Sequence, residues 1–330
     1  MKACLAGAIA AVLIASAAQA GPAGYRIVDR IPAPDGPWDF LRVDPARDRL
    51  LVTRGSSVMS VDLSTRAVTA GFVAGQRTHD ALPVNGGNEV LVTNGGNDTA
   101  TFFDAATGAE LGATPTGKGP DAATYDAKTG LALVMDHLGG QVTLIDPATH
   151  KAAGTIEVGG VLEVAATDGE GLAFVNVEDR NEVAVLDLAA RKVLRRYALP
   201  GCDGPTGLVY EASHRWLVAA CDGSTVVLKA ADGAVVATLR TGKAADGVAL
   251  DAARKLAFVP GREGSLSVIS LAGPRPAVVG VVPTDPGVKT LALDPRSGRV
   301  YLPTARFAAA PAGARPVATP GSFVILVIGK

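Results

Sequence analysis

The sequence predicts an all-β fold, a seven-bladed β-propeller, for nearly the whole chain. Apolar runs of four to six residues alternate with turns rich in Asp, Pro, Gly and Thr, and the segment Gly119–Ile156 holds four such runs. Runs of this length are typical of β-strands, and these polar residues supply turn geometry. Four short strands in a repeat of about forty residues indicate a propeller blade. We therefore expect four-stranded antiparallel blades around a common axis.

Two independent markers give the length of the repeat. The residue that ends the first strand of each copy recurs at spacings of 41, 41, 42, 43, 40 and 43 residues: Asp44, Asn85, Asp126, Asp168, Glu211, Asp251 and Asp294. The residue that ends the third strand recurs at spacings of 42, 42, 41, 42 and 41 residues: Asp62, Asp104, Asp146, Asp187, Lys229 and Ser270. Because the markers stay in phase, we predict seven blades.

The second copy carries a recognisable motif. It contains Leu91-Val-Thr-Asn94 followed by Gly-Gly-Asn-Asp. This stretch resembles the YVTN-type β-propeller repeat of the YncE-like group of secreted bacterial proteins, and the resemblance covers essentially the whole mature chain. It implies the propeller fold. It does not imply one activity, because a single fold hosts many functions.

The first twenty residues have the features of a secretory signal peptide. Lys2 gives a short positive region, Leu5–Ala18 is almost wholly apolar, and Ala18-Gln-Ala20 is a small-x-small cleavage site. Cys4 has no lipobox before it. The alternative is an uncleaved anchor, although the apolar run is short for a membrane span. We expect residues 1–20 to be a signal peptide, residues 21–330 to be one propeller domain, and the location to be periplasmic or extracellular.

The charge balance excludes some partner classes. Without residues 1–20 the chain has 30 Lys and Arg against 32 Asp and Glu, a net charge of −2. This balance predicts neither nucleic acid nor an anionic membrane as a partner. After residue 20 no sustained helical periodicity is present, so we expect almost no helix and no membrane insertion. We expect a monomer.

The blades follow in order along the chain, and the last blade needs a strand from the N-terminus. Blade one runs from Trp38, which begins its innermost strand, to Ala74, and later blades end near Lys118, Gly159, Leu199, Leu239 and Thr284. The last copy has only three strands, whereas Tyr25–Ile31 is a strand without a local partner. Pairing the two closes the ring and removes an exposed edge. The alternative is a loose N-terminal tail.

The long loop Arg306–Pro320 lies between the second and third strands of blade seven. Loops of this length are functional covers or mobile excursions, and we expect a cover.

Charged residues recur at the start of the innermost strands, five residues before each first-strand marker. These positions are Asp39, Asp80, Asp121, Glu163, Thr206, Asp246 and Lys289. They are predicted to surround the top mouth of the central channel. As a ligand site they fit a small ligand, a protein partner or a divalent cation such as Ca²⁺ or Mg²⁺. The structural alternative is that each side chain hydrogen-bonds nearby backbone.

Two histidines accompany this ring. His79 precedes Asp80 and His137 follows Asp136, so His79, Asp80, Asp121 and His137 form a candidate set of ligands for a transition metal such as Zn²⁺. Their spacing is not a recognised metal motif, and hydrogen-bonding histidines are the alternative. His150 and His214 fall in turns at the opposite face and are predicted to lie outside the site.

No catalytic motif stands out. The sequence has no G-x-S-x-G elbow, no phosphate-binding or dinucleotide-binding glycine motif and no haem attachment motif. We predict a non-catalytic binding or scaffold protein. The alternative is a lactonase-like hydrolase that uses a metal held by top-face carboxylates.

The two cysteines that follow the signal region are predicted to form a disulfide. Cys202 precedes the first strand of blade five and Cys221 ends its antiparallel second strand. Both should lie at the top face within disulfide reach, and export would bring them to an oxidising compartment. Two separate thiols are the alternative.

Overall fold

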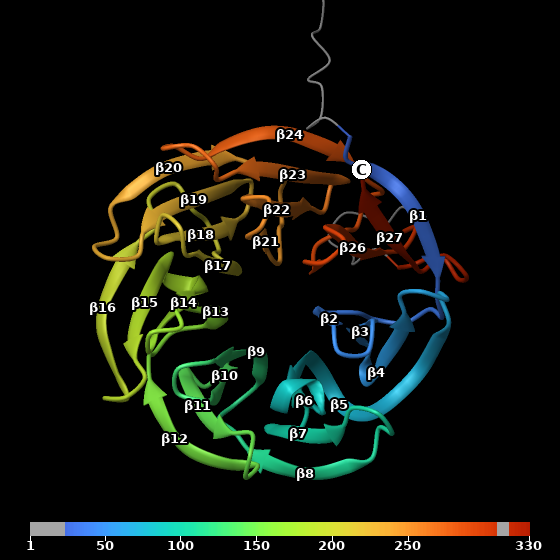
Figure 1. The fold of residues 1–330 in the computed structure, drawn as a ribbon, viewed down its shortest axis with the longest axis horizontal. Coiled ribbons are helices and arrows are strands. Elements are labelled where there is room, and N and C mark those ends of the chain that lie inside the picture. Colours follow the sequence, from blue (N-terminus) through green and yellow to red (C-terminus); the bar gives the residue numbers. More distant parts are fainter. Residues whose placement is uncertain (1–23, 309–316) are drawn as a thin grey trace, which may run out of the picture.

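The structure, a computed structural model, describes residues 24–308 and 317–330. In this part of the chain every regular element is a β-strand except for two short 3₁₀ turns, η1 (Asn85–Gly87) and η2 (Glu178–Arg180). The sheets are arranged around a common axis, and in most sheets the strand with the lowest number lies nearest the centre (Figure 1). The prediction of an all-β chain with almost no helix is confirmed. The expected signal peptide lies outside the described residues.

Five of the six sheets have four antiparallel strands each. They contain β9 (Pro120–Asp126), β10 (Leu131–Asp136), β11 (Gln141–Asp146) and β12 (Lys151–Glu157); β13 (Leu162–Thr167), β14 (Leu172–Val177), β15 (Glu182–Asp187) and β16 (Lys192–Ala198); β17 (Gly207–Glu211), β18 (Trp216–Cys221), β19 (Ser224–Lys229) and β20 (Val235–Arg240). Two more contain β21 (Ala249–Asp251), β22 (Leu256–Gly261), β23 (Ser265–Ser270) and β24 (Ala277–Pro283); and β25 (Ala292–Asp294), β26 (Arg299–Thr304), β27 (Val324–Gly329) and β1 (Arg26–Pro32).

The sixth sheet has seven strands. Its members are β2 (Leu41–Asp44), β3 (Arg49–Thr53), β4 (Gly55–Asp62), β5 (Val68–Val84), β6 (Glu89–Asn94), β7 (Thr99–Asp104) and β8 (Glu110–Pro115). The 17-residue strand β5 pairs with β4 through its first half and with β6 through its second half. The structure therefore has six hydrogen-bonded sheets where the repeat count predicts seven, because one continuous strand joins the first two repeats.

The N-terminal strand lies beside the C-terminal strand. β1 pairs with β27 in antiparallel register from Arg26↔Gly329 to Pro32↔Val324. Ile31 of β1 is 2% exposed and belongs to a core cluster with Leu41, Leu50 and Phe323. Burial of this side chain contributes to holding the N-terminal strand against the last sheet.

The core lies between neighbouring sheets. Second and third strands such as β10 and β11 are buried along almost their whole length, as expected for sheets covered on both faces. The large side chains Phe102, Phe174, Phe258 and Tyr301 are almost completely buried. This packing keeps the first strands at fixed positions around the axis, and the charged residues described below lie in these strands or in the segments next to them.

Several predicted boundaries shift by a few residues. Trp38 does not begin a strand, because β2 begins at Leu41. In the loop Arg306–Pro320, Phe307 forms an isolated antiparallel bridge with Ala318, and residues 309–316 lie outside the described part. Within the described residues no helix has the length and apolar character needed to cross a membrane.

Candidate functional site

Charged side chains from six repeats meet near the axis in a chain of alternating sign, here called the inner ring. Its members are Asp246, Lys289, Asp39, His79, Asp121, His137 and Glu163. Lys289 pairs with Asp246 and lies 3.4 Å from Asp39. Counted formally, with every carboxylate ionised and both imidazoles protonated, the ring has four negative and three positive groups. Its formal net charge is then −1.

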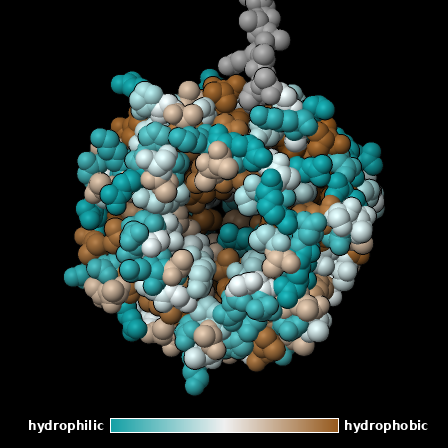
Figure 2. All heavy atoms as spheres, viewed as in Figure 1, coloured by the Kyte–Doolittle hydropathy of each residue, from teal (hydrophilic) through white to brown (hydrophobic). Residues whose placement is uncertain are grey.

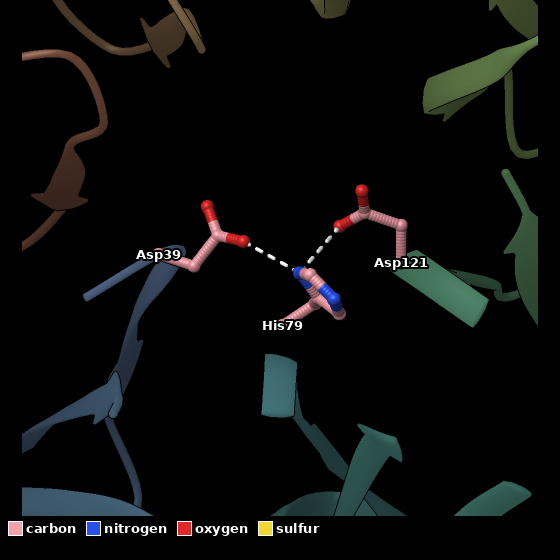
Figure 3. A group of neighbouring side chains, drawn as sticks. All are labelled: Asp39, His79 and Asp121. Carbon is pink, nitrogen blue, oxygen red and sulfur yellow. Dashed lines mark hydrogen bonds and ion pairs between the residues drawn. The ribbon is translucent and has the colours of Figure 1, made fainter. Parts of the chain in front are cut away.

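His79 of β5 stands between two carboxylates, that of Asp39 just before β2 and that of Asp121 in β9. Its Nδ1 lies 2.6 Å from Asp39 Oδ2 and 3.5 Å from Asp121 Oδ1, and the three side chains point toward one another (Figure 3). Asp121 Oδ1 is buried and has no hydrogen-bond partner among the described residues. An orphaned carboxylate oxygen is costly in a folded protein, and a bound cation is one way to satisfy it.

His137 stands between the next pair of carboxylates. Its Nδ1 lies 3.2 Å from Glu163 Oε1 and 3.9 Å from Asp121 Oδ2, and also 3.0 Å from the carbonyl oxygen of Leu162. The backbone N–H of His137 donates to the carbonyl of Gly119, whose φ of +62° suits a glycine. This backbone contact holds the loop after β10 against the start of β9. Asp121, His137 and Glu163 thus form a second compact group of possible metal ligands.

The crowding of like charges changes the proton affinity of the ring. Burial, followed by the charge of Asp39, raises the pKa of Asp121 to about 7. Burial also raises the pKa of Glu163 to about 8, although its hydrogen bond with His137 opposes the change. The hydrogen bond with Glu163 raises the pKa of His137 to about 9, against the effect of burial. The ring therefore has more carboxylates than its own cations stabilise.

The pKa values of the two other basic groups, His79 and Lys289, are both raised. Burial lowers the pKa of His79, but the hydrogen bond with Asp39 and the charge of Asp121 outweigh it, so the net pKa is raised. Burial opposes the charge of Lys289, and Asp246 and Asp39 reverse that effect, so the pKa of Lys289 is also raised.

Asp80 does not belong to the inner ring, contrary to the prediction. Its side chain is completely buried, and Arg42 Nε and Nη2 donate to its two oxygens at 2.9 and 2.6 Å. The backbone N–H groups of Ala81 and Ala123 donate to it as well. Asp80 thus ties its own strand to Arg42 of β2 and to β9 of the following repeat.

The reason is a one-residue error in the marker of the second repeat. Asp44 pairs with Arg49 and Asp126 pairs with Leu131, and the equivalent pair in the second repeat is Val84 with Glu89. The marker is therefore Val84 instead of Asn85, and the ring position five residues earlier is His79. Successive side chains of a strand point to opposite faces, so a shift of one residue puts His79 at the ring position and turns Asp80 away from it.

Threonine at the ring position of the fifth repeat has a structural role. The Thr206 hydroxyl donates to the carbonyl of Ala245 at 2.8 Å. Other threonines bridge neighbouring repeats in the same way, since Thr53 donates to the carbonyl of His79, Thr93 to that of Asp121, and Thr290 to that of Asp39. The sequence analysis missed these bridges and Arg42. The recurring Thr in the last two residues of strands β3 and β6 is the signal that could have found some of them.

Two hollows adjoin the inner ring. A cavity of about 470 Å³ is lined by first strands and is mostly apolar, with Arg42, Tyr210 and Asp246 among its polar lining residues. A second cavity of about 360 Å³, here called the rim pocket, is lined by Glu178, Asp203, Thr206, Asp222, Asp246, Arg262 and Lys289 together with small residues. Both volumes are within the usual range for small-ligand sites. The face drawn in Figure 2 is hollowed at its centre, with hydrophobic and hydrophilic atoms inside the hollow.

The predicted disulfide is confirmed and lies beside the rim pocket. Cys202 and Cys221 are bonded, with a Cα–Cα distance of 5.4 Å. Each precedes an acidic residue of the rim pocket, and the backbone N–H of Asp222 donates to the carbonyl of Asp203 at 2.8 Å. The disulfide therefore holds the backbone segments that carry two acidic residues of the pocket close together.

The remaining histidines contact acids elsewhere. His150 Nε2 lies 2.7 Å from Glu89 and the ring stacks on Phe102, whereas His214 Nδ1 lies 2.8 Å from Glu211 and the ring stacks on Trp216. Neither is a member of the inner ring.

Comparison with known proteins supports the fold. No protein-family model and no curated protein matches the sequence. Among solved structures, a chain of Kuenenia stuttgartiensis hydrazine synthase matches with a TM-score of 0.69 and 17% identity, over 82% of this chain and 92% of that chain. A chain of a mitotic checkpoint complex matches with a TM-score of 0.74 and 14% identity, over 91% of this chain and 95% of that chain. At these identities the similarity establishes a β-propeller type of fold and leaves function open.

Proposed function

We propose that the chain is an exported, seven-bladed propeller of the YVTN type, with a signal peptide at residues 1–20 and one domain at residues 21–330. The seven-stranded sheet supports seven blades if its junction strand β5 is counted in both of the first two. The β1–β27 pairing supports a closed ring. The disulfide supports an oxidising location such as the periplasm.

We further propose that this propeller is a non-catalytic binding protein with its ligand site at the mouth of the central channel. One observation carries this proposal: the inner ring, with four carboxylates among its members, adjoins the rim pocket, which shares Asp246 and Lys289 with it. A charged mouth with low-dielectric walls concentrates oppositely charged ligands. The mouth therefore favours a ligand that carries at least one positive group.

The rim pocket narrows the class of ligand. Glu178, Asp203 and Asp222 supply negative charge, and Arg262 supplies a guanidinium. A small zwitterion, with an amine for the carboxylates and a carboxylate for Arg262, matches both signs and fits a volume of about 360 Å³. A protein partner that offers a Lys side chain next to an acidic one is the macromolecular form of the same chemistry.

Binding of small zwitterions by the metal-free protein tests the proposal. A screen of amino acids against the mature chain in EDTA, followed by calorimetry, should find a ligand whose affinity falls about tenfold or more in Asp203→Asn with Glu178→Gln. Asp232→Asn, in the exposed turn between β19 and β20, is the matched control. Equal affinity in the pocket variant and the control contradicts the assignment of the pocket.

A metal-assisted hydrolase is the second candidate. Asp121 favours it, since a carboxylate with a pKa of about 7 beside two groups of metal-ligand type could act as a general base. Lactone hydrolysis that requires added metal and disappears in Asp121→Asn would support this candidate over simple binding.

A further inference from the structure

We propose that the inner ring binds one divalent transition metal ion, held by Asp121, His137 and Glu163. This inference rests on the proposed function, because it gives the binding site at the channel mouth its cation. It differs from the set that the sequence indicates, since Glu163 joins Asp121 and His137 as a ligand, whereas Asp80 and His79 are not ligands.

The spacing of the three ligand atoms suits a metal. Zinc-type ions bind imidazole nitrogen and carboxylate oxygen at about 2.0–2.2 Å, so two ligands of a tetrahedral site lie about 3.3–3.6 Å apart. His137 Nδ1 lies 3.2 Å from Glu163 Oε1 and 3.9 Å from Asp121 Oδ2, and the three atoms lie within 4.8 Å of one another. Small side-chain rotations would bring them to metal-binding distances.

The neighbouring group around His79 fits a supporting role better. His79 Nδ1 is only 2.6 Å from Asp39 Oδ2, which is a hydrogen-bond distance and too short for two ligands of one ion. Asp39 also contacts Lys289. His79 is therefore oriented by Asp39, and its Nδ1 lies 3.5 Å from Asp121 Oδ1, which is an ion-pair distance from the metal-binding carboxylate. Contacts of this kind outside the ligand set position metal ligands.

Burial and charge point the same way. Glu163 is 7% exposed, and His137 is its ion-pair partner among the described residues. Asp121 Oδ1 is buried without a hydrogen bond. A divalent cation held by these three side chains would place positive charge next to carboxylates that crowd one another.

The chemistry of the donors selects the class of metal. Imidazole together with two carboxylates suits Zn²⁺, Co²⁺ or Mn²⁺ better than Ca²⁺, which takes six to eight oxygen ligands. His137 Nδ1 also lies 3.0 Å from the carbonyl oxygen of Leu162. A bound ion and this carbonyl therefore compete for the same nitrogen atom.

Calorimetric titration of the EDTA-stripped, dialysed mature chain with Zn²⁺, and with Co²⁺ followed by its visible spectrum, tests the site. We expect one ion per chain. His137→Gln and Glu163→Gln should each weaken binding 100-fold or more, and His79→Gln should weaken it about tenfold, as supporting residues do. His150→Gln is the matched control, because His150 also pairs with a carboxylate, that of the half-buried Glu89, but lies outside the ring. This variant should bind the metal ion as the parent does.

Two results would overturn the inference: no binding of Zn²⁺ or Co²⁺ by folded parent protein, or equal binding by the parent and His137→Gln. Circular dichroism of each variant checks that it is folded. The outcome is separable from the proposed function, because zwitterion binding is measured in EDTA with rim-pocket variants. Metal binding without a zwitterion ligand, or the reverse, identifies which of the two proposals fails.

Discussion

At the scale of single residues, Asp80 and Asp121 are both acidic and both near the axis, yet they have opposite energetic roles. Asp80 is fully buried and receives four hydrogen bonds, two of them from Arg42. Asp121 is crowded by other acids, and its pKa is raised to about 7. Both oxygens of Asp80 accept hydrogen bonds, whereas one oxygen of Asp121 has no hydrogen-bond partner among the described residues.

Substitution by Asn should separate these roles. Asp80→Asn removes one partner of a buried ion pair and should lower the unfolding free energy by about 3 kcal/mol. Asp121→Asn removes a crowded charge and should leave the unfolding free energy at pH 7.5 unchanged or higher. Urea denaturation of the metal-free variants measures both. A larger loss in Asp121→Asn than in Asp80→Asn contradicts the assignment of roles.

The turn acids that end the third strands give a second residue-scale prediction. Asp62 accepts hydrogen bonds from the backbone N–H groups of Thr65 and Ser64 and from the Ser64 hydroxyl, which lower its pKa to about 2. Because the folded pKa lies below the unfolded value of about 3.8, the carboxylate stabilises the fold above pH 4, and this contribution is lost as the pH falls toward 2.

Thermal unfolding of Asp62→Ala should reveal this dependence. The melting temperature of the variant should be below that of the parent at pH 6, and the difference should shrink on acidification from pH 4 to pH 2. Asp104 occupies the same turn in the next repeat, and its pKa is also lowered by the backbone N–H of Thr107. A pH-independent difference would mean that the charge of Asp62 contributes nothing.

At the scale of elements, the disulfide links the entry to β17 with the end of β18. It spans 19 residues in sequence and, in the chain-entropy model, contributes about 3 kcal/mol to stability. Cys202→Ser with Cys221→Ser should therefore lower the melting temperature and also loosen Asp203 against Asp222 in the rim pocket. Calorimetry with and without reductant measures the first effect in the parent. An unchanged melting temperature in reductant, with free thiols verified by mass spectrometry, would contradict it.

At the scale of the whole molecule, the β1–β27 pairing joins the two ends of the chain. Deletion of residues 21–32 would expose the edge of β27 and remove Ile31 from its core cluster. Exposed edges recruit other strands, so we expect a lower melting temperature and oligomers in size-exclusion chromatography. Val28→Ala, at a side chain 38% exposed on the same strand, is a control that should remain monomeric and nearly as stable. A deleted chain that melts and migrates as the parent does would remove the support for closure.

The repeat markers show how far the sequence reached toward the structure. All six predicted ends of third strands coincide with observed strand ends, from Asp62 of β4 to Ser270 of β23. The first-strand markers miss the strand end by one residue in two repeats: Val84 ends β5 and Asn85 lies in η1, and Thr167 ends β13 one residue before Asp168. Turn residues are local signals, whereas register depends on the partner strand, so an apparently regular spacing can hide a shift of one residue.

The sequence alone determined the β-sheet repeat, the pairing partner of the N-terminal strand and the disulfide, because apolar periodicity, turn residues and cysteine positions are encoded locally. It also indicated that His79, Asp121 and His137 would meet. Only the tertiary structure decided that Asp80 turns away to Arg42, that Glu163 faces His137, and that Lys289 contacts Asp39 across 250 positions of sequence. Those contacts depend on how neighbouring sheets place their first strands, and small differences in register decide which side chains face the axis.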